Sequence, residues 1–233
     1  MELKNNILGL CILAGLVVLG LSIPASVRTL KSYDRTVSVK GLCEREVQAD
    51  KVIWPLVFKV VGNELDPLGK EIASKTAKIE DFLGSGGIPS SEITVSLPKI
   101  SDKFANEYGG NDRLYRFVAT CTVTVCSSDV QAVLALMADQ SSLIGSGIAL
   151  ASEWGETPQF RFEGLNSIKP EMIEEATRNA REVALKFAKD SGSRLGKIKD
   201  AAQGTFSIED RDSNTPSIKK VRVVTYVTYY LKK

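Results

Sequence analysis

Residues 114–125 read LYRFVATCTVTV, the longest clear alternation of apolar and other side chains in the chain. Successive side chains of a β-strand point to opposite faces, so this alternation predicts a strand with one apolar face and one face rich in threonine. Such a strand is typical of an antiparallel sheet that is covered on one side only. The apolar face is predicted to carry Tyr115, Phe117, Ala119, Cys121, Val123 and Val125.

Several other segments have the length and composition of strands. One of them contains Pro55, and because proline has no N–H to donate, we expect that strand at a sheet edge or at a bulge. Brief apolar runs around Ile93 and Phe160 predict shorter strands. The longer predicted strands cover residues 36–43, 51–61, 197–208 and 221–231.

Two long segments have apolar residues at helical spacing. The first is predicted to begin with Asp66 as the N-cap and Pro67 at the first helical position, and glycines from Gly84 onward end it. The second is predicted to run from Pro170 to about Ser191 and to be closed by Gly192. Its expected inner face carries Ile173, Ala176, Ala180, Val183, Ala184, Phe187 and Ala188.

A short helix and a connection complete the soluble part. Ser128 and Gln131 have the spacing of a capping box, which predicts a helix directly after the central strand. Residues 140–158 are rich in Ser, Gly and Ala and are predicted to form a mobile connection. Paired strands with two long helices and one short helix between them predict an α+β fold of mainly antiparallel sheets.

The N-terminal segment indicates a membrane protein. Residues 5–27 carry no charge, and residues 7–23 (ILGLCILAGLVVLGLSI) are almost wholly apolar. A helix of that length spans roughly 26 Å, enough for the core of a bilayer. We therefore expect an N-terminal transmembrane anchor with its flanks over residues 1–31 and a soluble domain over residues 32–233.

A cleaved signal peptide and a buried soluble helix are the alternatives for this segment. The charge before it is weak because Glu2 offsets Lys4, and the small residues after it lack an A-x-A cleavage pattern. Lysine and arginine near the two ends favour a cytoplasmic domain. An apolar segment this close to Met1 favours export, which we weight more heavily. The expected location is the bacterial inner membrane, with a single span and the soluble domain in the periplasm.

Composition excludes several kinds of chemistry. The chain has no histidine, so it lacks the commonest general base and metal ligand, and its net charge of +2 gives no argument for nucleic acid. We therefore expect no catalytic residue, no cofactor and no metal site. Two acidic clusters are interpreted as solvated strand ends and loops, with a carboxylate hydrolase or a calcium loop as minor alternatives. They are Glu44, Glu46 and Asp50, and Glu209, Asp210 and Asp212.

Three of the four cysteines lie in the predicted soluble domain. Cys121 and Cys126 are five residues apart on one strand, so their side chains point to opposite faces and they cannot pair with each other. Either one bridge, such as Cys43 to Cys121, or three buried thiols fits the sequence.

Three stretches of this sequence, taken together, resemble the SIMPL-domain family. They are VSVKGLCEREVQADKVIWPLVF, IPSSEITVS and EEATRNAREVALKFAKDSGSRLGKI, and they span about residues 36–231. In the first, Cys43 and Ala49 replace a glycine and a proline of the family pattern. The third is the most specific. The residues that match the family's motifs are Gly41, Ala176, Ala180, Ala184, Ala188, Gly192, Leu195, Gly196 and Lys197.

The resemblance implies an exported or envelope-tethered α+β domain of the kind found in bacterial periplasmic oxidative-stress defence and outer-membrane immunogenic proteins. It implies self-association and loose links to stress tolerance or signalling, and it supplies no catalytic residues. We therefore expect a non-enzymatic, membrane-tethered homo-oligomer. Tyr226, Tyr229 and Tyr230 are its candidate contact residues. The alternative is a periplasmic module that binds an unknown small molecule or peptide beneath Trp154, with residues 140–158 as a lid.

Overall fold

A computed structural model describes residues 13, 15–18, 20, 35–105, 114–151 and 156–232. The chain forms two compact units, each with its own sheet. Among the described residues, unit 1 consists of residues 13, 15–18, 20, 35–45, 167–207 and 221–232. Unit 2 consists of residues 46–166 and 208–220, without the gaps given above. Both units combine strands and helices, so the predicted α+β class is confirmed.

The sheet of unit 1 has the strand order β1-β9-β7, and β8 also pairs with β9. Its strands are β1 (Thr36–Gln48), β7 (Arg194–Gln203), β8 (Ser207–Asp210) and β9 (Ile218–Lys232). β1 and β9 are antiparallel, because Leu231 N donates to Arg35 O and the hydroxyls of Ser38 and Thr228 are hydrogen-bonded at 2.9 Å. The predicted strand over residues 197–208 is in fact two strands, β7 and β8.

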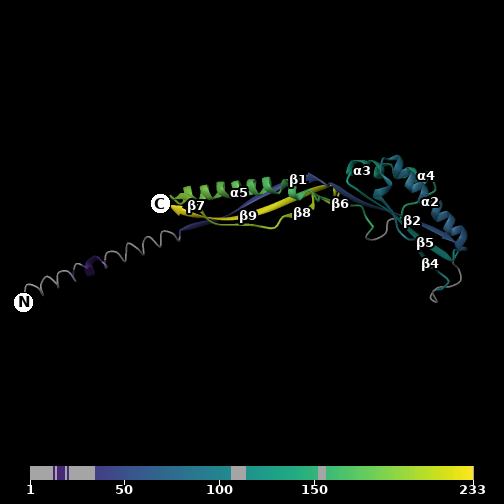
Figure 1. Ribbon diagram of the computed structural model, residues 1–233, viewed down its shortest axis with the longest axis horizontal. Helices are drawn as coiled ribbons and strands as arrows, with labels where there is room; N and C mark the ends of the chain where they lie inside the picture. Colours follow the sequence, from purple (N-terminus) through teal and green to yellow (C-terminus); the bar gives the residue numbers. More distant parts are fainter. Residues whose placement is uncertain are drawn as a thin grey trace, which may run out of the picture. The chain divides into compact units, whose positions relative to one another are not determined.

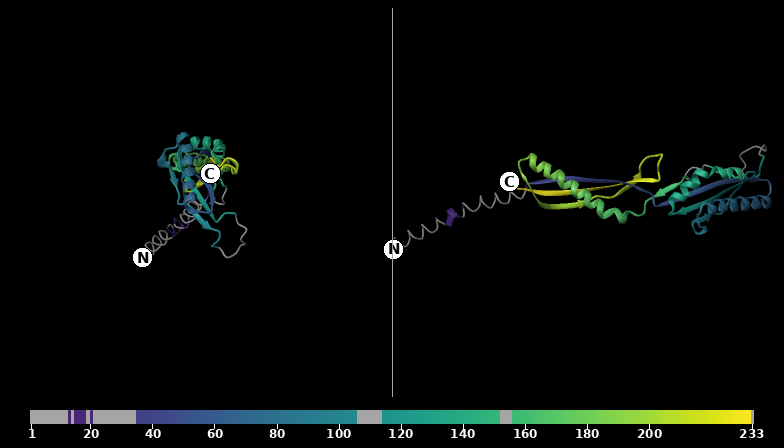
Figure 2. Two further views of the ribbon diagram at one scale, coloured as in Figure 1. Left: turned by 90° about the vertical axis from the view of Figure 1, so that its right-hand side faces the viewer. Right: turned by 90° about the horizontal axis from the view of Figure 1, so that it is seen from above.

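Helix α5 (Leu165–Asp190) lies along one face of this sheet (Figure 1). Figure 2 shows it running obliquely across the strands. A row of every fourth side chain is itself inclined to a helix axis, so an oblique helix presents such a row to the sheet. The buried residues of α5 form this row: Met172, Ala176, Ala180, Ala184 and Ala188.

The prediction for the inner face of α5 was therefore correct for the alanines and wrong for two larger side chains. Val183 and Phe187 are 40% and 56% exposed. Each lies one residue before a buried alanine of the contact row. One residue corresponds to about 100° around the helix, so both side chains point away from that row. A straight helical stripe would include them, but the oblique crossing of α5 leaves them outside the contact.

The helix also begins earlier than predicted. It starts at Leu165, and Pro170 lies inside it. The carboxylate of Asp50 accepts hydrogen bonds from the backbone N–H groups of Glu163 and Gly164, at 2.8 and 2.7 Å. These bonds fix the chain just before the helix, in the manner of an N-terminal cap. Gly192, at φ +62°, follows the end of the helix as predicted.

The sheet of unit 2 has the order β3-β5-β2-β6, and β4 also pairs with β5. Its strands are β2 (Lys51–Gly62), β3 (Ile93–Val95), β4 (Lys99–Asp102), β5 (Phe117–Ser127) and β6 (Gln159–Arg161). All of these pairings are antiparallel. The strand that contains Pro55 was predicted at a sheet edge or at a bulge, and this is wrong for β2, which lies between β5 and β6 in unbroken register with β5. The proline is accommodated because the pairing with β6 covers only Lys51–Ile53 and stops before it. Strand β4 was not predicted.

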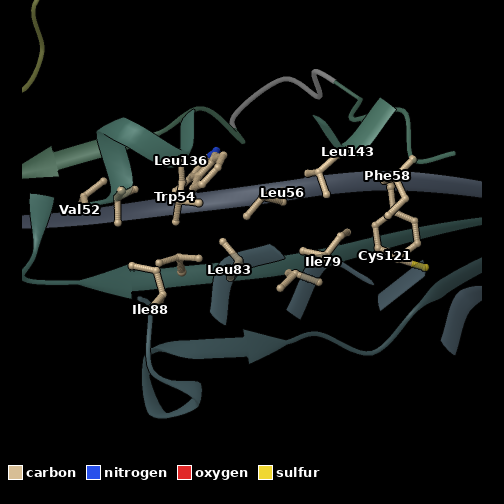
Figure 3. Packing of buried hydrophobic residues seen from close by; sticks show 14 of the residues in the cluster. Val52, Trp54, Leu56, Phe58, Ile79, Leu83, Ile88, Cys121, Leu136 and Leu143 are labelled. Carbon is tan, nitrogen blue, oxygen red and sulfur yellow. The ribbon is translucent and has the colours of Figure 1, made fainter. Parts of the chain in front are cut away.

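The helices α2 (Leu65–Ser85), α3 (Val130–Asp139) and α4 (Ser141–Gly145) lie on one face of this sheet, and a short 3₁₀ turn spans Ser90–Glu92 (Figure 1). The core between them is built from large apolar side chains, as Figure 3 shows. Alternate residues of β2 face Ile79 and Leu83 of α2 and Leu136 of α3. These residues of β2 are Val52, Trp54, Leu56 and Phe58.

Two helix starts differ from the predictions. Helix α2 begins at Leu65 after Glu64, so Asp66 and Pro67 lie within its first turn. Helix α3 is capped by Asp129, whose carboxylate accepts from Ala132 N at 3.0 Å, and not by Ser128. An aspartate is as good an N-cap as a serine, and here it is one residue closer to the first helical turn.

The predicted mobile connection over residues 140–158 is wrong for its first half. These residues form α4, and the side chains of Leu143 and Ile148 are 2% and 1% exposed in the core of unit 2. Leu150 then forms an antiparallel bridge with Phe58 of β2. This part of the segment is therefore packed in place and cannot serve as a lid. Trp154, on which the predicted pocket depended, lies outside the described residues.

The predicted transmembrane anchor over residues 7–23 lies mostly outside the described residues and stays a prediction. In the part of the chain that the structure describes, no helix is both long enough and apolar enough to cross a membrane.

Candidate functional site

Gly41 of β1 is where α5 approaches the sheet of unit 1 most tightly. A Cβ atom at Gly41 would clash with the carbonyl oxygen of Ala176 and would lie 2.6 Å from the backbone nitrogen of Ala180. No L-residue with a side chain fits at such a distance without displacing the helix. Gly41, Ala176 and Ala180, all of them positions of the family motif, thus form one contact of backbone on backbone.

A polar contact secures the same strand beside this point. The amide nitrogen of Asn179 donates to the carbonyl oxygen of Leu42 at 2.8 Å. Arg45, further along β1, pairs with Glu171 at 2.9 Å and with Glu175 at 3.6 Å. Glu171, Glu175 and Asn179 follow the same flank of α5 at intervals of four residues, so this part of the flank is joined to β1 by hydrogen bonds and ion pairs.

Cys43 lies beneath this flank and is buried. Burial and a hydrogen bond with Glu175 raise the pKa of its thiol to about 11, because both favour the neutral form. A thiol with so high a pKa is a poor nucleophile at neutral pH. Cys121 is also buried, in unit 2, while Cys126 is exposed, as expected for opposite faces of β5. All three are free thiols, so the alternative of a Cys43–Cys121 bridge is wrong, and the alternative of three buried thiols is correct for Cys43 and Cys121 but wrong for Cys126.

The end of the family motif lies at the start of β7. Leu195 packs against the small core of unit 1, and Lys197 is exposed. A Cβ at Gly196 would lie 2.8 Å from the carbonyl oxygen of Tyr230 on β9. The ladder between β7 and β9 is irregular between Leu195 and Ile198, so Gly196 allows close strand contact at a bulge.

The three tyrosines near the C-terminus do not lie on one surface. Tyr229 is 3% exposed and belongs to the core of unit 1, on the face that α5 covers. Tyr226 is 45% exposed on the opposite face of β9, with the ammonium of Lys40 over its ring at 5.1 Å from the centroid. Tyr230 is half-buried on that same face, and Lys199 lies over its ring at 5.6 Å. The contact surface predicted from sequence therefore reduces to Tyr226 and Tyr230.

The first acidic cluster is spread among different partners. Glu44 pairs with Arg222 at 3.3 Å, and Glu46 pairs with Arg211 at 3.5 Å. Asp50 holds the two backbone N–H groups before α5. Each carboxylate thus has a structural partner, whereas the interpretation from sequence was solvated strand ends and loops.

The second acidic cluster forms a closed turn. Asp210 pairs with Lys219, and Asp212 accepts hydrogen bonds from Thr215 and Arg211. These bonds, with one from the backbone of Asn214, lower the pKa of Asp212 to about 2. Over the described residues, no group of three or more Cys, Asp or Glu side chains is arranged to hold a metal ion.

Unit 2 contains a cavity that the sequence did not reveal. It lies on the face of the sheet opposite to α2 and has a volume of about 300 Å³. Its lining includes Thr120, Thr122 and Thr124, whose alternation was visible in the sequence, and two charged residues that no pattern singled out. These two are Lys99 and Glu156.

Comparison with known families agrees with the motifs. The sequence model of a family described as "SIMPL: Protein of unknown function (DUF541)" matches residues 37–229. The chain belongs to the SIMPL family. The match covers both units of this SIMPL protein and all nine motif residues, so the resemblance inferred from three motifs is confirmed. No curated protein matches the chain.

Proposed function

We propose that this SIMPL protein is a non-enzymatic, membrane-tethered envelope protein that assembles with copies of itself. In this proposal residues 7–23 span the bacterial inner membrane once, and both units lie in the periplasm. The family resemblance adds a link to stress tolerance or signalling. The observation that carries the proposal is the exposed aromatic surface on the sheet of unit 1.

This surface has the composition of a protein contact. Tyr226 is 45% exposed and lies directly across from Lys40 in the antiparallel register of β1 and β9. Leu42, two residues further along the same face of β1, is 41% exposed. Tyrosine buries a large rigid area at low entropic cost and is enriched in interfaces. The alternating side chains of β1 and β9 thus offer aromatic, aliphatic and cationic groups side by side.

The position of β1 favours assembly as well. In the sheet order β1-β9-β7, β1 stands at one end among the described strands. Edge strands present backbone N–H and C=O groups that another chain can pair with. The side chain of Asn179 donates a hydrogen bond to one carbonyl of this edge, that of Leu42. This carbonyl is therefore not available for pairing with a strand of another chain.

The environments of the reactive side chains support a role without bond-making. The thiol of Cys43 is held neutral by burial and Glu175, and the carboxylates of Glu44, Glu46 and Asp210 form ion pairs. The sequence contains no histidine to act as a base at neutral pH.

The self-assembly is tested on the full-length chain in detergent micelles, by size-exclusion chromatography with light scattering corrected for bound detergent. We expect an oligomer at micromolar concentration, and a shift toward smaller species in the variant Tyr226→Ala. The matched control is Ile144→Ala, which removes an apolar side chain that is 69% exposed on α4 of unit 2. A monomeric parent chain, or equal effects of both variants, would contradict the proposal.

The location is tested through the exposed thiol. Cys126 is exposed, whereas Cys43 and Cys121 are buried, so a maleimide that cannot cross membranes should label Cys126 in intact spheroplasts. Peptide mapping by mass spectrometry identifies the labelled residue. Labelling of Cys126 only after the spheroplasts are lysed would place unit 2 in the cytoplasm instead.

A further inference from the structure

The cavity in unit 2 lies between two strands and the segments beside them. Its floor is formed by alternate residues of β5, Thr120, Thr122 and Thr124, which point away from the helices. Pro55 of β2 lies across from Thr124 in the register, and Ile53 precedes it on the same face. The floor therefore offers a row of hydroxyl groups beside an apolar strip.

One wall of the cavity exists because the neighbouring ladder is interrupted. Ile93 of β3 lies opposite Val125 of β5, and Lys99 of β4 lies opposite Thr120 of β5. The segment from Ile93 to Lys99 is therefore one residue longer than the segment of β5 that it faces. The extra residue falls between β3 and β4, where Ser96 N donates to the carbonyl oxygen of Thr122 at 3.0 Å. An extra residue in one strand bends it away from its partner. Here the bend leaves Leu97, a lining residue, 91% exposed.

The opposite wall holds an incompletely bonded carboxylate. The Oε2 atom of Glu156 is buried, and within the described part of the chain it has no hydrogen-bond partner. An ionised oxygen withdrawn from water without a donor is costly, and buried polar atoms in native proteins are nearly always bonded. A ligand that supplies an N–H donor to this oxygen would remove that cost.

We propose that this cavity binds a small zwitterion of the amino-acid type with a short aliphatic side chain. The ammonium group of the ligand donates to Glu156, because a charge-assisted bond suits a buried carboxylate best. Its carboxylate is held by Lys99 and the threonine hydroxyls, and its aliphatic part lies against Pro55 and Leu97. A volume of about 300 Å³ is at the small end of ligand pockets, which fits a single amino acid.

The probe is radiolabelled L-valine, measured by equilibrium dialysis against the full-length chain in detergent micelles. We expect saturable binding of one valine per chain. Glu156→Gln keeps the size of the side chain and removes its charge, and it should weaken binding about 10-fold or more. Thr122→Val, which replaces a hydroxyl by a methyl group, should weaken it about 2- to 10-fold. Absence of saturable binding up to millimolar valine overturns the proposal.

A matched variant and three competitors make the assignment specific. Glu209→Gln changes an exposed carboxylate on β8 that does not line the cavity, and it should bind valine as the parent chain does. Three competitors should each displace valine poorly. N-acetylvaline lacks the ammonium charge, valinamide lacks the carboxylate, and glucose is a neutral polyol. Equal binding by Glu156→Gln and the parent, or equal competition by N-acetylvaline or glucose, overturns the ammonium contact.

Thermal unfolding without valine separates binding from a structural role. Because Oε2 of Glu156 has no partner in the described residues, Glu156→Gln should leave the melting temperature unchanged or raise it. A large drop in melting temperature would mean that the carboxylate stabilises the fold, which contradicts the proposed role.

Discussion

The two units of this SIMPL protein pack a helix on a sheet in opposite ways. In unit 1, α5 meets β1 through alanines and a glycine, and the compact core cluster contains only Val39, Ala180, Ala184, Val227 and Tyr229. In unit 2, α2 meets β2 and β5 through large side chains such as Phe58, Ile79 and Leu83, all about 1% exposed or less. One contact joins two backbones at short range, and the other fills a wide layer with interlocking side chains.

This difference determines which kind of substitution each unit tolerates. A layer of large side chains loses stability when atoms are removed, since the cavity that results is only partly refilled. A close backbone contact loses stability when atoms are added, since neither backbone can move aside without disturbing its own hydrogen bonds. Gly41, Gly196 and the alanines of α5 belong to the second kind, which explains why these motif positions hold glycine or alanine in this chain.

The largest expected effect is the loss of a large side chain from unit 2. Phe58→Ala should lower the free energy of unfolding by about 3–5 kcal/mol, measured by urea denaturation. The matched control is Phe104→Ala, which removes the same atoms from a side chain that is 57% exposed and should change the free energy by less than about 0.5 kcal/mol. Similar losses in the two variants would mean that the layer of large side chains does not stabilise unit 2.

The next effect comes from one added methyl group in unit 1. Gly41→Ala should lower the free energy of unfolding by about 1–3 kcal/mol, because its Cβ meets the backbone of α5. Gly84→Ala is the matched control on α2, where an added Cβ has no atom within 4 Å. In a helix that change should stabilise the chain by about 0.5–1 kcal/mol. If Gly41→Ala proved neutral, the close backbone contact would not govern unit 1.

The smallest expected effect is a difference in chemical reactivity between one thiol of each unit, Cys43 in unit 1 and Cys126 in unit 2. Iodoacetamide at pH 8 should modify the exposed Cys126 and leave the buried Cys43 intact, as read by peptide mapping. The pKa of Cys43 is about 11 when folded, against 9.0 for an ordinary thiol, so the folded state binds this proton more tightly than the unfolded state does. The stability from this thiol is complete below pH 9 and is lost as the pH rises through about 11. Rapid modification of Cys43 in the native protein at pH 8 would contradict this burial.

Local patterns predicted the elements that depend on neighbours in the sequence. The alternation of residues 114–125 gave β5 with its two faces correctly assigned, and Gly192 marked the end of α5. The starts of α2 and α3 were displaced by two residues and one residue. In α3 the neighbouring Asp129 is the cap in place of Ser128, and α2 begins without a side-chain cap. Strand β4 was missed because its sequence, KISD, contains one apolar residue among polar and charged ones and therefore shows no alternation.

The candidate binding site was beyond the reach of sequence patterns for a different reason. Its threonines come from one strand, whereas Lys99 and Glu156 are separated from each other by more than fifty residues and meet only at the sheet. No spacing along the chain connects them. Their juxtaposition depends on the antiparallel register of β5 with β4 and of β2 with β6.

The sequence by itself determined the SIMPL family, the α+β class and the row of alanines, because each follows from residue types at fixed spacings along the chain. Only the tertiary structure decided that α5 crosses its sheet obliquely, that Tyr229 is internal while Tyr226 is exposed, and that a buried carboxylate oxygen faces a row of threonines. These features depend on how distant segments are placed against one another. That placement is set by the closest approach of backbones and by strand register, which no local period encodes.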